Sequence, residues 1–250
     1  MFRFLADDPE STQRWFSQPA AAGLIAQESC LLGDLLSRMS GYRGVSLASW
    51  PIEDSVVARA GTLRHWQLGV GARTDKVDVQ WDGLRLPLAS SSVDALVLMH
   101  GLEVVSQPHA LIRECARVLS DRGQLAVFCF NPLSWWALRQ SMPTGRAERF
   151  TPCCVPPRAA RLIDWLRVLD IETDECWRYG PGYPLFGRPW RAQGDASWLG
   201  CIAWQAPGYA LLARRRVSCR PSSGKRERVA AKSARSGLAQ PAGRQITWRR

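Results

Sequence analysis

The sequence lacks any long apolar run, which excludes a protein that crosses a membrane with helices. No stretch of the 250 residues approaches the ~20 consecutive apolar residues that a spanning helix needs. The N-terminal segment carries Asp7, Asp8 and Glu10 where a secretion signal would have its apolar part. We therefore expect a cytoplasmic protein with no membrane partner.

Metal-ligand patterns are also missing. The chain has only three histidines, and its eight cysteines include no C-x-x-C pair, since Cys153 and Cys154 are adjacent. This excludes the usual structural zinc motifs, and we predict no metal site. The remaining thiols mostly stand in apolar or helical contexts, where free cysteine behaves as a small apolar residue.

The sequence has no charge surplus outside its C-terminal end. The net charge is +11, and residues 214–250 hold twelve Lys/Arg against the single acid Glu227, so the rest of the chain is balanced. The predicted organisation is a domain over residues 1–217 and a basic, disordered tail over residues 218–250. Two interpretations stay open for the basic end at 214–250: contact with nucleic-acid phosphates, or a solubilising segment.

Apolar periodicity predicts the elements of the first half of the domain. A helix is expected over residues 19–39, where Leu24, Leu31 and Leu35 recur at helical spacing. Short strands are expected over residues 44–49, 63–70 and 76–81, with one or two helical turns over residues 54–60.

The pattern is clearer from residue 93 onward. A buried strand over residues 93–99 precedes a helix that we expect to end at Gly123, and a second buried strand covers residues 125–130. Further expected elements are a helix at 158–169 and strands at 171–177 and 208–213. Strand, helix and strand in this order predict a Rossmann-like α/β fold with helices on both faces. The sheet is expected to be mostly parallel, with an antiparallel last strand.

Ligands of such sheets bind beyond the carboxyl ends of the strands. The candidate residues are those that follow each predicted strand: Ala48, Ser49 and Trp50, then Asp82 and Gly83, then His100 and Gly101, and finally Asn131 and Pro132.

The segment from Asp82 to Phe130 resembles a known family. Its Asp82-Gly83-x-x-Leu86-Pro87, Ser92-Val93-Asp94 and Arg117-Val118-Leu119 with Gly123 are similar to motifs of the type-11 group of class I S-adenosylmethionine-dependent methyltransferases. His100-x-Leu102-Glu103 and Phe130-Asn131-Pro132-x-Ser134-x-Trp136 resemble a little-characterised bacterial branch of that group. The resemblance implies S-adenosylmethionine as cofactor and methyl transfer to an unidentified acceptor.

The resemblance also implies which residues bind the cofactor. They are the residues at the matching strand ends: Leu47, Ala48, Ser49, Asp82, Gly83, Leu84, His100 and Gly101. Asp82 would accept a hydrogen bond from the adenine amino group, although an Asp-Gly pair is also a common turn. His100 is the candidate catalytic residue, and a capping or core histidine is the alternative. Asn131 would bind a ligand or form a turn, His109 and Asp94 are expected to be structural, and Glu103 solvated.

The front half departs from the family pattern. Ala48 stands where the branch keeps a glycine, Trp50 and Pro51 follow at once, and no carboxylate ends the second predicted strand to hold the ribose. The alternative function is therefore an inactive methyltransferase-fold protein that binds or regulates, with nucleic acid as a partner through its tail.

Overall fold

The computed structural model describes residues 14–48, 52–70, 78–81, 85–134, 137, 152, 154–180 and 206–216. The helices are η1 (Pro19–Ala21), α2 (Ala22–Arg38), α3 (Asp54–Val57), α4 (Gly101–Val104), α5 (Pro108–Val118) and α7 (Ala159–Val168). The strands are β1 (Ser40–Ala48), β2 (Gly61–Val70), β3 (Val79–Trp81), β4 (Val93–Met99), β5 (Leu119–Phe130), β6 (Ile171–Tyr179) and β7 (Gly208–Arg215).

These strands form a seven-stranded sheet in the order β3-β2-β1-β4-β5-β7-β6. The pairs from β3 to β5 are parallel, whereas β7 runs antiparallel to both β5 and β6. The predicted Rossmann-like sheet with an antiparallel last strand is confirmed.

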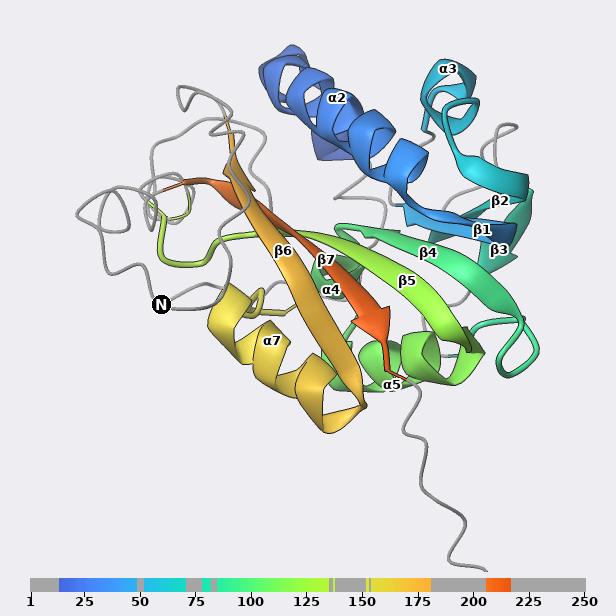
Figure 1. The fold of residues 1–250 in the computed structure, drawn as a ribbon. Coiled ribbons are helices and arrows are strands. Elements are labelled where there is room, and N and C mark those ends of the chain that lie inside the picture. The colour runs from blue at the N-terminus through green and yellow to red at the C-terminus, as the bar shows by residue number, and fades with distance from the viewer. Residues whose placement is uncertain are drawn as a thin grey trace, which may run out of the picture. The chain divides into compact units, whose positions relative to one another are not determined.

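Helices cover both faces of the sheet, as Figure 1 shows: α2 and α3 lie on one face, and α4, α5 and α7 lie on the other. Two apolar clusters follow from this arrangement, one under each helical layer. β4 lies in the middle of the sheet and contributes alternate residues to both, so its side chains from Ala95 to Met99 are all buried.

The α2 helix shows why the first half folds as predicted. Its leucines recur at helical spacing and are almost fully buried against the sheet: Leu24, Leu31, Leu32, Leu35 and Leu36. Pro19 begins the preceding 3-10 turn, where its missing N–H costs no hydrogen bond. The helix ends at Arg38 because Met39 is extended and leads into β1.

Several predicted boundaries differ from the observed ones, and the end of the α5 helix is the clearest case. The α5 helix ends at Val118 and not at Gly123, because Leu119 is already extended and pairs with Val93. Gly123 lies inside β5, where a Cβ atom would come within 2.6 Å of the Leu119 side chain. The glycine therefore serves a close contact within a strand and does not end the helix.

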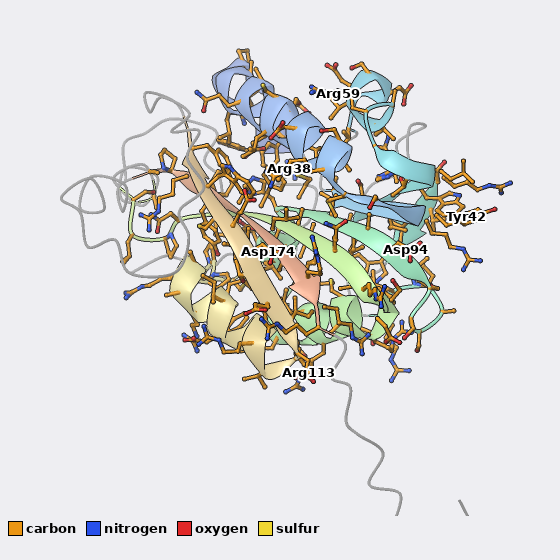
Figure 2. All side chains as sticks on the ribbon, in the orientation of Figure 1. Arg38, Tyr42, Arg59, Asp94, Arg113 and Asp174 are labelled. Atoms are coloured by element: carbon orange, nitrogen blue, oxygen red, sulfur yellow. The ribbon has the colours of Figure 1, made fainter. Side chains whose placement is uncertain are left out.

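Asp94 joins β1, β4 and β5 at the amino end of the parallel sheet (Figure 2). Its carboxylate accepts hydrogen bonds from the Tyr42 and Arg43 N–H groups at 2.9 and 3.1 Å and from the Ser120 hydroxyl at 2.9 Å. Burial would raise the pKa of Asp94, but these hydrogen bonds outweigh it and lower the pKa. The predicted local, structural role of Asp94 is confirmed.

Among the described residues, no helix combines the length and the apolar character needed to cross a membrane.

Candidate functional site

The carboxyl ends of β1, β4 and β5 lie next to one another at one edge of the sheet. Ala48 pairs with Met99, which in turn pairs with Phe128. This register brings four of the predicted site residues together: Leu47, Ala48, His100 and Gly101. The other predicted cofactor residues lie outside the described part of the chain: Ser49, Asp82, Gly83 and Leu84.

Leu47 and Ala48 have buried side chains. The Leu47 side chain joins the apolar cluster under α5 and α7, and the Ala48 side chain joins the one under α2. They are 0% and 6% exposed. A cofactor at this edge would therefore meet the end of β1 through its backbone N–H and C=O groups.

The connection from β1 to β2 is short and fixed at Ile52. The Ile52 N–H donates to Gln67 Oε1 at 3.1 Å, and the Gln67 amide donates to the Ile52 carbonyl at 3.2 Å. The α3 helix that follows has four residues, a single turn. The long helix that a nucleotide-binding sheet usually places after its first strand is therefore reduced to one turn here.

The β2 strand carries no acidic residue from Gly61 to Val70. A carboxylate at the end of this strand is the group that binds ribose hydroxyls in related sheets. Among the described residues, the backbone ends of β1 and β4 are open to S-adenosylmethionine as possible contacts, whereas β2 offers no carboxylate for its ribose.

His100 is a fully buried polar residue at this edge. Its backbone is in the left-handed region, with φ of 51°, at the junction of β4 and α4, and its side chain is fully buried. Its Nε2 lies 2.8 Å from Glu28 Oε1 on α2, and its Nδ1 lies 3.1 Å from Glu103 Oε1 on α4. Glu103 Oε1 also accepts a hydrogen bond from the Phe130 N–H at 2.7 Å.

These contacts define a buried polar cluster of Glu28, His100 and Glu103. Burial alone would lower the pKa of His100, but the negative charges and hydrogen bonds of Glu28 and Glu103 outweigh it and raise the pKa to about 10. The imidazole is therefore charged at neutral pH and links α2 to β4, α4 and β5. This geometry favours the structural alternative for His100, while its catalytic role stays a prediction.

The cluster contains more acceptors than donors. Within the described part of the chain, Glu28 Oε2 and Glu103 Oε2 are buried and accept no hydrogen bond of normal geometry. Glu103 is fully buried, so the sequence-based expectation that it is solvated is wrong. The signal for Glu28 was available in the sequence, because a single acid stands in the apolar stripe of α2.

Aromatic residues enclose the cluster. The Phe130 ring lies 4.1 Å from the His100 ring, and the Phe16 ring lies 5.4 Å from it, measured between centroids. Trp15 packs edge-on against Phe16 and Phe130 at 4.9 and 5.9 Å. The segment before α2 thereby covers the ends of β4 and β5 on the α2 face.

Gly101 has a packing role. A Cβ atom there would come within 2.3 Å of Leu98 Cδ1, so a larger residue at the start of α4 would force the buried Leu98 side chain to move. This accounts for the glycine without a ligand, and its predicted cofactor contact stays a prediction.

The segment after Asp82-Gly83 is held by the α5 helix. Arg117 donates to the carbonyls of Leu86 and Leu88 at 3.1 and 3.0 Å, and Glu114 accepts from the Leu86 N–H at 3.2 Å. Glu114 and Arg117 also pair with each other at 2.8 Å. The sequence gave no signal for these contacts of Glu114 and Arg117 with the backbone.

Asn131 forms a turn, as one of its two interpretations stated. Its side-chain amide donates to the Ala206 carbonyl at 3.1 Å, and its Oδ1 accepts from the Leu133 N–H at 3.2 Å. The His109 ring packs at a tilt of 38° against Trp165 with ring centroids 3.6 Å apart, in agreement with a structural role. Trp177 packs in the apolar cluster under α2.

The described residues hold no group of three or more His, Cys, Asp or Glu side chains that could bind a metal ion. The described cysteines are all free, and three of them are buried: Cys115, Cys129 and Cys176.

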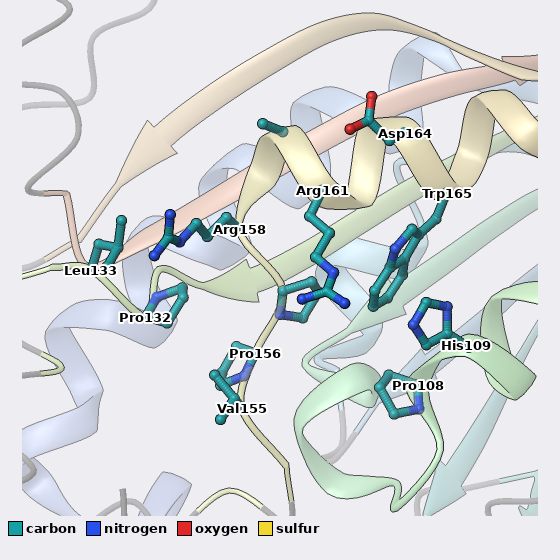
Figure 3. A pocket seen from close by; sticks show the side chains of 12 residues that line it. Pro108, His109, Pro132, Leu133, Val155, Pro156, Arg158, Arg161, Asp164 and Trp165 are labelled. Carbon is teal, nitrogen blue, oxygen red and sulfur yellow. The ribbon is translucent and has the colours of Figure 1, made fainter. Parts of the chain in front are cut away.

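A cavity of about 830 Å³ opens at the same edge of the sheet, on the face that α5 and α7 cover. It lies between the start of α5, the start of α7 and the residues that follow β5 (Figure 3). The sequence did not predict this cavity, because its walls come from three separate parts of the chain.

The comparisons with known proteins agree with this architecture. Residues 59–127 match the model of a family described as "Methyltransferase domain", the type-11 group. The uncharacterised protein YafS of Escherichia coli is 33% identical over 154 residues, which are 59% of this chain and 60% of that protein. The chain therefore spans less than two thirds of the length of this relative.

Solved structures share the fold at low identity. A S-adenosylmethionine-dependent methyltransferase of Thermotoga maritima superposes with a TM-score of 0.53 at 14% identity, over 83% of this chain and 99% of that one. One from Aquifex aeolicus superposes with a TM-score of 0.52 at 12% identity, over 83% and 98%. The chain is thus a protein of the class I S-adenosylmethionine-dependent methyltransferase fold. The match of residues 59–127 to the type-11 family model and the shared fold agree with the resemblance seen in the sequence.

Proposed function

We propose that this protein binds S-adenosylmethionine and transfers its methyl group to an acceptor. The observation that carries the proposal is the strand order β3-β2-β1-β4-β5-β7-β6 with an antiparallel β7, together with the family match over residues 59–127. When bound, S-adenosylmethionine supplies a sulfonium methyl group that an oxygen, nitrogen or carbon nucleophile takes, while the carbon–sulfur electron pair stays on sulfur.

The chain's own residues would act mainly by positioning, since methyl transfer depends on holding donor and acceptor close and aligned. The backbone ends of β1 and β4 at Ala48 and His100 would hold the methionine part. Asp82 would accept from the adenine amino group, with Gly83 and Leu84 against the ring. Ser49 would add a polar group after β1. Arg117 and Glu114 would act through the backbone of residues 86–88, which they hold in place.

Calorimetric titration with S-adenosylmethionine tests the proposal. We expect measurable binding that falls about tenfold in Asp82→Ala, because the acceptor of the adenine amino group is lost. Asp121→Ala is the matched control, since Asp121 is exposed near the start of β5 and should leave binding unchanged. No heat and no thermal stabilisation of the unsubstituted protein at millimolar cofactor would contradict the proposal.

A second candidate is a methyltransferase-fold protein that has lost catalysis and binds or regulates. The one-turn α3 and the absence of an acid on β2 favour it, because both weaken the cofactor site. Binding of S-adenosylmethionine without transfer to any acceptor, or no binding at all, would support this candidate.

The basic end is the proposed contact for a nucleic-acid partner of that second candidate. Its first arginines are already engaged within the domain: Arg215 donates to the Ala116 and Leu119 carbonyls, and Arg214 and Arg216 pair with Asp174 and Glu172. Residues 217–250 lie outside the described part. Binding of RNA that falls steeply with salt and is lost on truncation after Val217 would support the contact. Equal binding by the truncated protein would refute it.

A further inference from the structure

The cavity between α5 and α7 has rigid walls. Four prolines line it: Pro108, Pro132, Pro156 and Pro157. The Tyr209 hydroxyl donates to the Pro157 carbonyl at 2.7 Å, and Cys154 Sγ donates to the Leu102 carbonyl at 3.1 Å, so residues 154–157 are tied to β7 and α4. The cavity is therefore formed before any ligand arrives, which lowers the entropic cost of binding.

Two arginines give the cavity a surplus of positive charge. Arg158 and Arg161 line it from the start of α7, and Asp164 is the only acid among its lining residues. In the described part of the chain, neither guanidinium forms an ion pair with Asp164 or with any other carboxylate. Both arginines are exposed at its rim and are therefore available to an anion in solution.

Two aromatic side chains, Trp165 and His109, lie beside these charges (Figure 3). The Arg161 guanidinium lies over the Trp165 ring at 5.5 Å, and the His109 ring contacts Trp165 at a tilt of 38° with its centroid 3.6 Å away. Trp165 is only half-buried. A planar ligand could therefore lie against the indole and imidazole edges while its charged group reaches the arginines.

The backbone of α7 also contributes positive charge to the cavity. Arg158 is the N-cap residue of α7 and its side chain makes no capping hydrogen bond. The N-terminal end of this ten-residue helix therefore contributes a partial positive charge on the side of the cavity where the arginines lie. This effect supplements the guanidinium groups and is not needed for the argument.

The position of the cavity relates it to the proposed reaction. Pro132 follows β5, and β5 is the direct neighbour of β4, which ends at His100. The cavity therefore opens at the same edge of the sheet as the strand end where the cofactor is proposed to bind.

We propose that this cavity binds a small anionic molecule with a planar apolar body, a carboxylate or a phosphate monoester, and that this molecule is the methyl acceptor. Its anionic group pairs with Arg158 and Arg161, and its planar part lies against Trp165 and His109. The role as acceptor rests on the proposed methyltransferase function, whereas the binding itself does not.

Saturation-transfer NMR titrations without cofactor test the binding. The probes are indole-3-acetate, its neutral amide indole-3-acetamide, and phenyl phosphate. We expect the acetate to bind about tenfold more tightly than the amide, because only the acid can pair with the guanidinium groups. Comparison of indole-3-acetate with phenyl phosphate shows whether the site prefers a carboxylate or a phosphate.

The variant Arg158→Gln/Arg161→Gln should remove the preference for the acid while leaving amide binding within about twofold. Arg113→Gln is the matched control, an exposed arginine on α5 that does not line the cavity. A thermal unfolding curve checks that the double variant is folded, as expected for two exposed residues.

Equal binding of acid and amide, an unchanged preference in the double variant, or no binding of any probe at millimolar concentration would overturn the proposal. Because these titrations omit S-adenosylmethionine, their outcome is independent of cofactor binding. If indole-3-acetate binds but cofactor does not, the methyltransferase function and the acceptor role fail and the anion site stands.

Discussion

The front of the sheet, β1 to β3, and the rear, β4 to β7, each hold a histidine, and the two differ in their electrostatic surroundings. Among the described residues, the hydrogen-bond partners of the half-buried His65 on β2 are neutral, with Nε2 2.7 Å from the Ser46 hydroxyl and Nδ1 3.4 Å from the Thr62 hydroxyl. His100 after β4 lies between two carboxylates. Burial lowers the pKa of His65 to about 4, against the charge of Asp78, whereas that of His100 is raised to about 10.

The comparison separates what holds the fold from what would bind the cofactor. In the rear half, the buried polar cluster ties α2, β4, α4 and β5 together at the edge where ligands bind. In the front half, the same edge has a one-turn helix and no acid on β2. The buried polar cluster therefore fixes the conformation of the rear edge. The affinity for the cofactor depends on how many contacts the front edge can still make with it.

Removal of the His100 imidazole should have the largest effect on stability. In His100→Ala, Glu28 and Glu103 remain buried without their cation, and we expect the free energy of unfolding to fall by ~3–5 kcal/mol in urea denaturation. His109→Ala is the control, because the His109 side chain is exposed. The free energy of unfolding of this variant should fall by less than about 1 kcal/mol.

The cluster also predicts a partial rescue. Adding Glu28→Gln and Glu103→Gln to His100→Ala removes both uncompensated charges, so the triple variant should be more stable than the single one. If His100→Ala and His109→Ala destabilise the protein equally, the cluster does not hold the two faces together.

Lowering the pH should reduce the stability of the protein through His65, the histidine on β2. The pKa of His65 is lowered in the folded state, so the unfolded chain binds more protons between about pH 6.5 and pH 4. Its neutral form therefore contributes stability above pH 6.5, and that contribution is lost as the pH falls toward 4. His100 acts in the opposite direction: its raised pKa gives stability that is complete below pH 6.5 and is lost as the pH rises toward 10.

When the pH falls from 7 to 4.5, we expect the free energy of unfolding to decrease by about 2 kcal/mol less in His65→Gln than in the unsubstituted protein. The reason is that glutamine does not titrate. Urea denaturation across this range measures the difference. His109→Gln serves as the exposed control. Parallel pH profiles for the His65 variant and the unsubstituted protein would mean that His65 is charged in the folded state.

Much of this fold could be predicted from the sequence, since buried strands and amphipathic helices have clear periodicities. The run from Val93 to Met99 predicted β4 with its correct bounds. The predicted end of α5 was wrong because Gly123 looks like a helix terminator. The glycine instead serves a close contact with Leu119 inside β5.

The site was less accessible to sequence reasoning. The position of His100 at a strand end could be predicted, but its partner Glu28 is 72 residues away in the chain, and only the packing of α2 on the sheet brings them together. The cavity depends in the same way on residues from α5, α7 and the end of β5. Periodicity reports which face of an element is buried, and it carries no information on which polar side chains meet there.

The smallest expected effect concerns the hold of α5 on residues 86–88. Arg117→Ala removes hydrogen bonds to the Leu86 and Leu88 carbonyls, and we expect a loss of about 1–2 kcal/mol in unfolding free energy. Arg113→Ala, on the same helix but without these contacts, should lose less than about 0.5 kcal/mol. Because this segment follows Asp82 directly, Arg117→Ala should also weaken S-adenosylmethionine binding in calorimetry. If the affinity is unchanged while stability falls, the segment is held for packing alone, and the rear half of the sheet does not support cofactor binding through α5.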